Sequence, residues 1–179
     1  MTQIGNVYGE ALYDLARSES VEDEIHGQLQ VLRDAFTQEG DFIRLLCSPN
    51  LTKEERVRIL DDSFRGKVHP YVLNFLKILT EKGYMRSFPD CVSAFTQHFN
   101  DDHNILPVTA VTAIAMAQSQ LDALTDKLSG LTGKTVILKN KVDTSVMGGV
   151  RLDYDGRRLD DTVSHRLNDI RSLLKNTAV

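Results

Sequence analysis

Apolar residues recur every three or four positions through the first hundred residues, which is the spacing of helices with one buried face. Short breaks separate six such segments, and we predict helices at residues 3–17, 21–37, 41–47, 52–64, 70–83 and 87–104. Gly40, the Ser48-Pro49-Asn50 turn and Gly83 mark breaks, and Pro70 suits the first turn of a helix. The sequence therefore predicts a mainly α protein that begins with a six-helix bundle.

The pattern changes near residue 105, where β-branched residues become frequent. Residues 105–112 and 135–139 predict strands on either side of a helix at 117–131, and another apolar run begins at Val146. Asp155-Gly156 favours the positive φ of a two-residue hairpin turn. Apolar spacing over residues 163–174, behind the capping candidates of Asp160-Asp161-Thr162, predicts a last amphipathic helix. We therefore expect a helical domain at 1–105 and a small α/β domain at 106–179, with its helices on one face of the sheet.

Composition narrows the class of protein. The 179 residues are 41% hydrophobic and 26% charged, and their formal net charge of −4 argues against broad nucleic-acid binding. No apolar stretch approaches the roughly 20 residues that span a bilayer. The first residues have neither the basic and apolar regions of a signal peptide nor the Arg- and Ser-rich character of a transit peptide. We expect a cytosolic chain whose membrane association is made through partners.

Three motifs resemble ligand sites and fail on spacing. Gly133-Lys134-Thr135 lacks the upstream glycine of a phosphate loop, since Leu128 stands there, and a predicted strand follows it. His98 and His103 are five residues apart and do not share a helix face. Asp153-Tyr154-Asp155-Gly156 lacks the later ligands of a calcium loop, so we interpret it as a hairpin turn.

The two cysteines, Cys47 and Cys91, lie among apolar residues, and we expect both to be reduced thiols in the core. Neither has a histidine and carboxylate arranged for nucleophilic catalysis, and no Gly-x-Ser-x-Gly motif occurs. We therefore predict no catalytic, cofactor-binding or metal-binding residues, and a protein that is not an enzyme.

Two of the predicted helices have more apolar surface than one core contact requires. In helix 70–83, Ile78 lies on a flank beside the inward residues Val72, Phe75, Leu76 and Leu79. Helix 3–17 has Tyr8, Ala11 and Leu15 beside Val7 and Leu12, and Gly5 and Gly9 would let another helix approach its backbone closely. Two explanations remain open: a two-sided core contact inside the bundle, or a groove for an amphipathic partner helix.

Three motifs, in this order, resemble a known family. They are Tyr8-Gly9-Glu10-Ala11-Leu12, then residues 74–83 (NFLKILTEKG), then residues 142–150 (VDTSVMGGV) with the hairpin and the Asp160-x-x-Val163-x-x-x-Leu167-x-x-Ile170 spacing. Together they resemble the F-type ATP synthase delta subunit, whose mitochondrial relative is the oligomycin-sensitivity-conferring protein. Two positions depart from the usual family pattern: Gly9, where alanine is common, and Asp160-Asp161-Thr162, where Asp-Gly-Ser is frequent.

The resemblance implies a non-catalytic stator subunit without cofactors. It would link the alpha/beta catalytic head to the peripheral stalk of b subunits, so that the head resists rotor torque during proton-driven ATP synthesis. By resemblance, the bundle holds the N-terminal helix of an alpha subunit between its first and fifth helices, at Tyr8, Ala11, Asn74 and Ile78, and residues 146–174 meet the stalk. The implied location is the cytoplasmic face of the bacterial inner membrane, peripheral and without direct insertion. The alternative is a helical adaptor, unrelated to ATP synthesis, that binds another amphipathic helix.

Overall fold

The computed structural model describes residues 2–48, 50–146, 148–154 and 156–160, and these form seven α-helices and a four-stranded sheet. The chain divides into two compact units, residues 1–100 and 101–179. The predicted mainly α class with a small sheet is confirmed. The predicted last helix, residues 163–174, lies outside the described residues.

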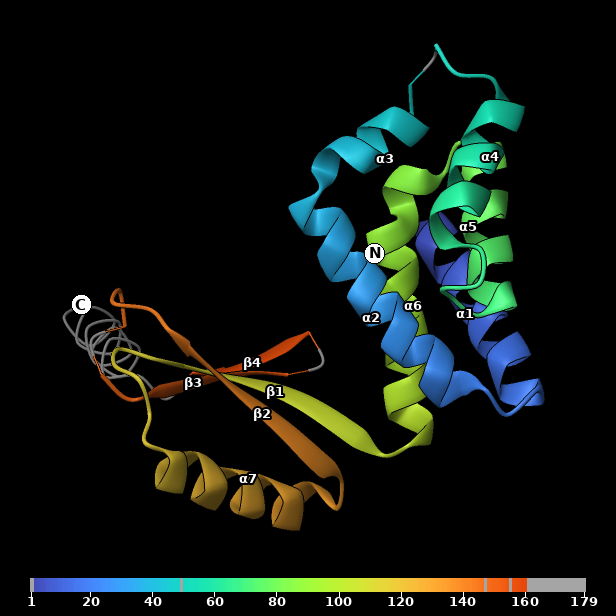
Figure 1. Ribbon diagram of the computed structural model, residues 1–179. Helices are drawn as coiled ribbons and strands as arrows, with labels where there is room; N and C mark the ends of the chain where they lie inside the picture. The colour runs from blue at the N-terminus through green and yellow to red at the C-terminus, as the bar shows by residue number, and fades with distance from the viewer. Residues whose placement is uncertain (1, 49, 147, 155, 161–179) are drawn as a thin grey trace, which may run out of the picture. The chain divides into compact units, whose positions relative to one another are not determined.

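The first unit is helical (Figure 1). Its elements are α1 (Gln3–Ser18), α2 (Glu22–Gln38), α3 (Gly40–Leu46), α4 (Lys53–Phe64), α5 (Pro70–Glu81), the 3₁₀ turn η1 (Met85–Ser87) and α6 (Phe88–Asp102), whose last residues enter the second unit. Gly40, expected only as a break, is the first residue of α3. The positive φ of 74° at Gly83 follows α5, as predicted for a residue that ends a helix.

The core of the first unit is apolar and centred on α5 and α6. Its fully buried large side chains include Phe88, Phe95, Ile25, Leu29, Leu60, Leu76 and Leu79. The predicted inward face of α5 is confirmed, since Val72, Phe75, Leu76 and Leu79 are all buried. In α4, Leu60 is fully buried, whereas Val57 is half-buried and lines a surface hollow.

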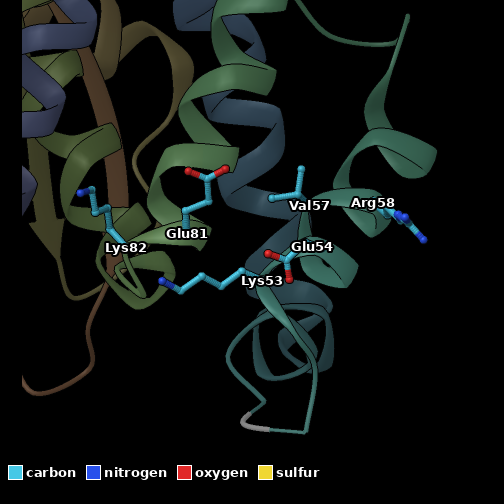
Figure 2. Close-up of a pocket in the computed structure, with 6 residues that line it drawn as sticks. All are labelled: Lys53, Glu54, Val57, Arg58, Glu81 and Lys82. Atoms are coloured by element: carbon cyan, nitrogen blue, oxygen red, sulfur yellow. The ribbon is translucent and has the colours of Figure 1, made fainter.

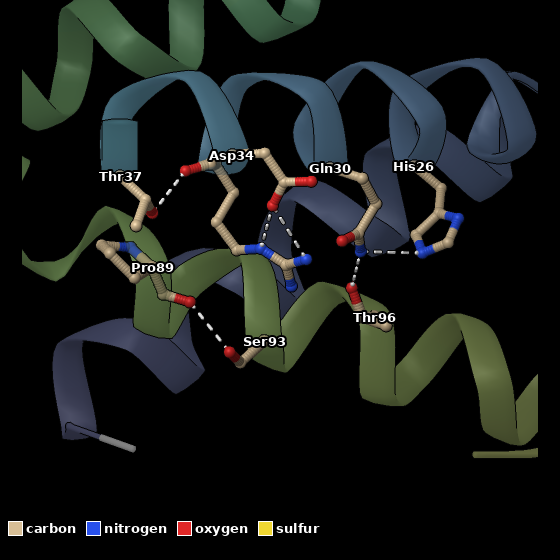
Figure 3. Close-up of polar contacts among 8 residues, drawn as sticks. His26, Gln30, Asp34, Thr37, Pro89, Ser93 and Thr96 are labelled. Carbon is tan, nitrogen blue, oxygen red and sulfur yellow. Dashed lines mark hydrogen bonds and ion pairs between the residues drawn. The ribbon is translucent and has the colours of Figure 1, made fainter. Parts of the chain in front are cut away.

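Polar contacts connect α2 with α6 beside this core (Figure 3). The Gln30 amide nitrogen donates to Thr96 Oγ1 at 2.8 Å and lies 3.2 Å from His26 Nε2. The His26 ring stacks on Phe99, with ring centroids 4.2 Å apart. A directional hydrogen bond beside apolar packing fixes how far one helix slides along the other.

The second unit is a sheet with one helix packed on it (Figure 1). Its elements are β1 (Ile105–Thr112), α7 (Gln118–Thr132), β2 (Thr135–Val142), β3 (Val150–Tyr154) and β4 (Arg157–Asp160), and the strand order is β2-β1-β3-β4. β1 and β2 are parallel and joined through α7, whereas β1 with β3 and β3 with β4 are antiparallel. The small core contains Val108, Ala110, Val136 and Leu152, with Leu124 and Leu128 of α7 packed against it.

Glycines determine where the hairpin strands begin and turn. In the apolar run that begins at Val146, strand β3 starts at Val150, directly after the glycine pair. Gly148 and Gly149 have φ of 110° and 86°, outside the extended conformation of a strand. Val146 itself is buried in the preceding loop. Gly156, between β3 and β4, has φ of 69°, in agreement with the predicted hairpin turn.

Candidate functional site

The three sequence motifs that resemble ligand sites lie in packing contacts, at a helix end or in turns of the structure. His98 stacks on Tyr13 with centroids 5.8 Å apart, and His103 is exposed. Gly133 ends α7 with a left-handed φ of 68°, and β2 rather than a helix follows Lys134, so this motif does not stand at the helix N-terminus that a phosphate loop uses. Among the described residues, no group of three or more histidine, cysteine, aspartate or glutamate side chains is placed to hold a metal ion.

The two cysteines differ in burial. Cys91 lies in the core, where burial raises the pKa of its thiol to about 11, so the thiol is protonated and weakly nucleophilic at neutral pH. Cys47 is only half-buried, which corrects the expectation that both thiols lie in the core. It ends the short helix α3, one residue beyond the buried Leu46.

A shallow hollow lies between α4 and the end of α5 (Figure 2). Lys53, Glu54, Val57 and Arg58 come from α4, and Glu81 and Lys82 come from the end of α5. Figure 2 shows the Arg58 side chain turned away from the other five. The charges are of mixed sign and the hollow is open, so it lacks the convergent polar groups of an active site.

Helix α1 packs on α6 through its small residues. A Cβ atom added at Gly5 would lie 2.5 Å from Asp90 Cβ, and one at Gly9 would meet the Cys91 carbonyl oxygen and lie 2.7 Å from Ala94 Cβ. The Asp90 carboxylate also accepts a hydrogen bond from the Thr2 backbone at 3.0 Å. The helix that approaches this glycine pair is therefore α6 of the same chain.

An apolar strip of α1, away from the glycine face, is exposed to solvent. Val7, Ala11 and Leu15, spaced at i, i+4 and i+8, are exposed, with Val7 at 58% and Leu15 at 41%. Tyr8 is half-buried beside this strip. The structure thus separates the two faces of α1 that the sequence left ambiguous: the glycine face serves the core, and the Val7 strip does not.

Of the predicted site residues on α5, Asn74 and Ile78 lie one turn apart and both are exposed, with Ile78 at 45%. Tyr8 meets Tyr84, three residues beyond α5, in an edge-to-face ring contact with centroids 5.9 Å apart. This contact brings α1 close to the turn that follows α5. Tyr8, Ala11, Asn74 and Ile78 thus lie on the two helices assigned by resemblance, with Ala11, Asn74 and Ile78 open to solvent and Tyr8 partly so.

Sequence reasoning missed a second apolar surface, on α2 and α3. Val31 is 70% exposed and Leu45 is 44% exposed. Val31 lies off the spacing of the inward residues Ile25, Leu29, Leu32 and Phe36, and this mismatch is the signal that identifies it.

No helix within the described ranges is both long and apolar enough to cross a membrane.

Comparisons with known proteins agree on one family. The family model for the ATP synthase delta (OSCP) subunit matches residues 4–174. The ATP synthase subunit delta of Clostridioides difficile (strain 630) is 31% identical over 172 residues, covering 96% of this chain and 95% of that protein. Its counterpart in Lactobacillus gasseri is 32% identical over 173 residues, covering 96% and 94%. A chain of the Toxoplasma gondii mitochondrial ATP synthase hexamer shares the fold, with a TM-score of 0.78 at 19% identity over 97% of this chain and 98% of that one.

Proposed function

This chain belongs to the ATP synthase delta (OSCP) subunit family, and we propose that its two units join the catalytic head of the complex to the peripheral stalk. It is a non-catalytic, stator-type subunit. The alternative of an adaptor unrelated to ATP synthesis is not supported, because the family model matches residues 4–174. What remains to be proposed is which surfaces carry the stator contacts.

The helical unit binds the head through α1 and α5. The observation that carries this assignment is the exposed strip of Val7, Ala11 and Leu15, which α1 keeps free while its glycine face packs on α6. Ile78, exposed on α5, supplies a second apolar position. An amphipathic helix, the N-terminal helix of an alpha subunit, fits such a surface because residues at i, i+4 and i+7 interdigitate with it.

The second unit contacts the b subunits of the stalk. Support comes from the family match, which continues through this unit to residue 174. Of the assigned stretch 146–174, the described part contains Val146, strand β3 and strand β4. Two moderate contacts joined in one chain gain strength through effective concentration, so neither interface needs to be tight alone. Holding the head against rotor torque then requires binding energy and no chemistry.

Calorimetry with a synthetic peptide tests the head contact. The peptide is the N-terminal segment of the alpha subunit encoded by the same organism, titrated into the full chain. We expect Ala11→Asp and Ile78→Asp to weaken binding at least tenfold, about 1.4 kcal/mol or more, because each places a charge in an apolar contact. The matched control is Val31→Asp, which puts the same charge on an exposed apolar position of α2.

All three positions are exposed, so each variant should keep the circular dichroism spectrum of the wild type. Equal loss of binding in Val31→Asp, or unchanged binding in both Ala11→Asp and Ile78→Asp, would remove α1 and α5 from the head contact. The family assignment would stand in either case, because it rests on residues 4–174 as a whole.

A further inference from the structure

We propose that a second apolar groove on the helical unit binds an amphipathic helix with basic residues at both ends. We name it the α2 groove, and it is lined by Val31, Ala35, Phe42, Leu45, Phe64 and Val68. Two hollows form it, and they adjoin at Ala35 and Phe64, which line both. This inference does not depend on the α1–α5 contact.

The wall of the α2 groove is already formed by aromatic packing. Phe42 and Phe64 meet edge to face with centroids 5.8 Å apart, and Phe36 stacks on Phe42 at 5.5 Å. Phe36 is buried and anchors the other two rings. A partner helix would therefore meet a preorganised surface and would not have to order these rings on binding.

The length of the α2 groove suits a helix. Its lining along α2 runs from Asp23 to Glu39, which corresponds to about 24 Å at the rise of about 1.5 Å per residue, or roughly four helical turns. Gly27 lies on this wall, and a Cβ atom there would meet nothing within 4 Å. The α2 backbone is thus accessible to a partner at Gly27, whereas the α1 backbone at Gly9 is covered by α6.

Acidic residues lie at both ends of the α2 groove. Asp23 and Glu24 line one end, and Glu39 and Asp41 line the other. Asp41 is paired with Arg44 at 3.0 Å, and both of these side chains are exposed. Lys67 is the basic residue among the lining residues of the two hollows. The carboxylates exceed the cations, so lysine or arginine flanking the apolar stripe of a partner complements the groove, and an acidic partner is repelled.

The probe for this inference is a synthetic helix that is not taken from any known partner. An 18-residue peptide with a leucine stripe and lysine flanks is labelled with fluorescein, and its anisotropy is followed as the full chain is added. A second peptide has the same leucine stripe and glutamate flanks. We expect the lysine peptide to bind and the glutamate peptide to bind at least tenfold more weakly.

Variants locate the binding. Val31→Arg should weaken binding of the lysine peptide at least tenfold. Leu131→Arg, the matched change at an exposed apolar residue of α7, should leave binding within twofold. The double variant Glu24→Gln, Glu39→Gln should weaken the lysine peptide several-fold at low salt and flatten its salt dependence. Circular dichroism verifies that each variant keeps its helices. Equal binding of the two peptides, or equal loss in Leu131→Arg and Val31→Arg, overturns the proposal.

Two other occupants have their own outcomes. If a peptide of residues 161–179 displaces the lysine peptide, the groove is a site for the end of this chain. If the full chain sediments as a dimer and Val31→Arg converts it to a monomer, the groove is an interface between two copies. Either result overturns the assignment to an external basic helix.

Discussion

Gly9 of α1 is packed tightly against α6, whereas Gly27 of α2 has open space beside it. A Cβ atom at Gly9 would collide with the α6 backbone, whereas one at Gly27 would point into open space. Gly9→Ala should therefore lower the free energy of unfolding by about 1–3 kcal/mol through overpacking. Gly27→Ala should raise it by up to about 1 kcal/mol, because alanine favours the helix and restricts the unfolded chain.

Urea unfolding followed by far-ultraviolet circular dichroism measures both changes. The pair is matched, since each variant adds one methyl group to a helical glycine. Equal midpoints for the two variants would show that α1 does not approach α6 at Gly9.

Asp61 connects α4 with α5. Its carboxylate lies 2.7 Å from Lys77 Nζ and 3.3 Å from Arg65 Nη2, and the hydrogen bond from Lys77, helped by the charge of Arg65, lowers the pKa of Asp61 below its ordinary value of 3.8. A lowered pKa in the folded state stabilises the fold above the unfolded pKa, and this contribution is lost as the pH falls through the folded pKa. Asp61→Asn should thus lower the unfolding midpoint at pH 7, and the deficit should shrink as the pH falls below 3.8.

Asp62→Asn is the control for this prediction, because it makes the same charge change at the exposed neighbouring position. Midpoints are compared for both variants and the wild type at neutral and acidic pH. A deficit in Asp61→Asn that stays constant with pH would argue for lost packing rather than lost charge.

At the scale of the element, α4 depends on its N-terminal cap. Thr52 Oγ1 accepts from the Glu55 backbone at 3.2 Å, and Glu55 Oε2 accepts from the Thr52 backbone at 2.8 Å, so the two residues form a capping box. Thr52→Ala should lower the free energy of unfolding by about 0.5–2 kcal/mol. Chemical denaturation measures it, and Thr52→Ser, which keeps the hydroxyl, should recover most of the loss.

Helix and strand positions could be predicted where local chemistry determines them. Pro70 and Gly83 are local signals, and α5 begins at Pro70 and ends at Glu81, shortly before Gly83. The conformation of the loop before β3 could not be predicted, because the positive φ at Gly148 and Gly149 follows from the path of the loop rather than from apolar alternation.

The candidate site could be predicted from the sequence only where spacing within one helix determines it. Spacing within α5 is enough to leave Ile78 outside the core, and the structure has it exposed. The spacing of Gly5 and Gly9 predicts a close helix approach but not which helix makes it, and α6 begins only at Phe88. The α2 groove was missed because three separate helices build it, and only their packing brings Val31, Leu45 and Phe64 to one surface.

At the scale of the whole molecule, the first unit has a core of its own. The fully buried phenylalanines Phe88 and Phe95 and their neighbours Ile25, Leu29 and Leu76 all belong to residues 1–100. A chain of about 100 residues is long enough to bury a stable core. We therefore predict that a fragment of residues 1–104 keeps a helical spectrum and a single cooperative urea transition. A spectrum of an unfolded chain would mean that the helices need the second unit to fold.

The linking role is tested most directly by reconstitution. Purified catalytic head and the soluble part of the b-subunit stalk are sedimented together, with and without the full chain. Head and stalk should sediment as one complex only when the chain is present, and Ala11→Asp should reduce that complex while the stalk still binds the chain. Head and stalk that associate equally well without the chain would contradict its role as the stator link.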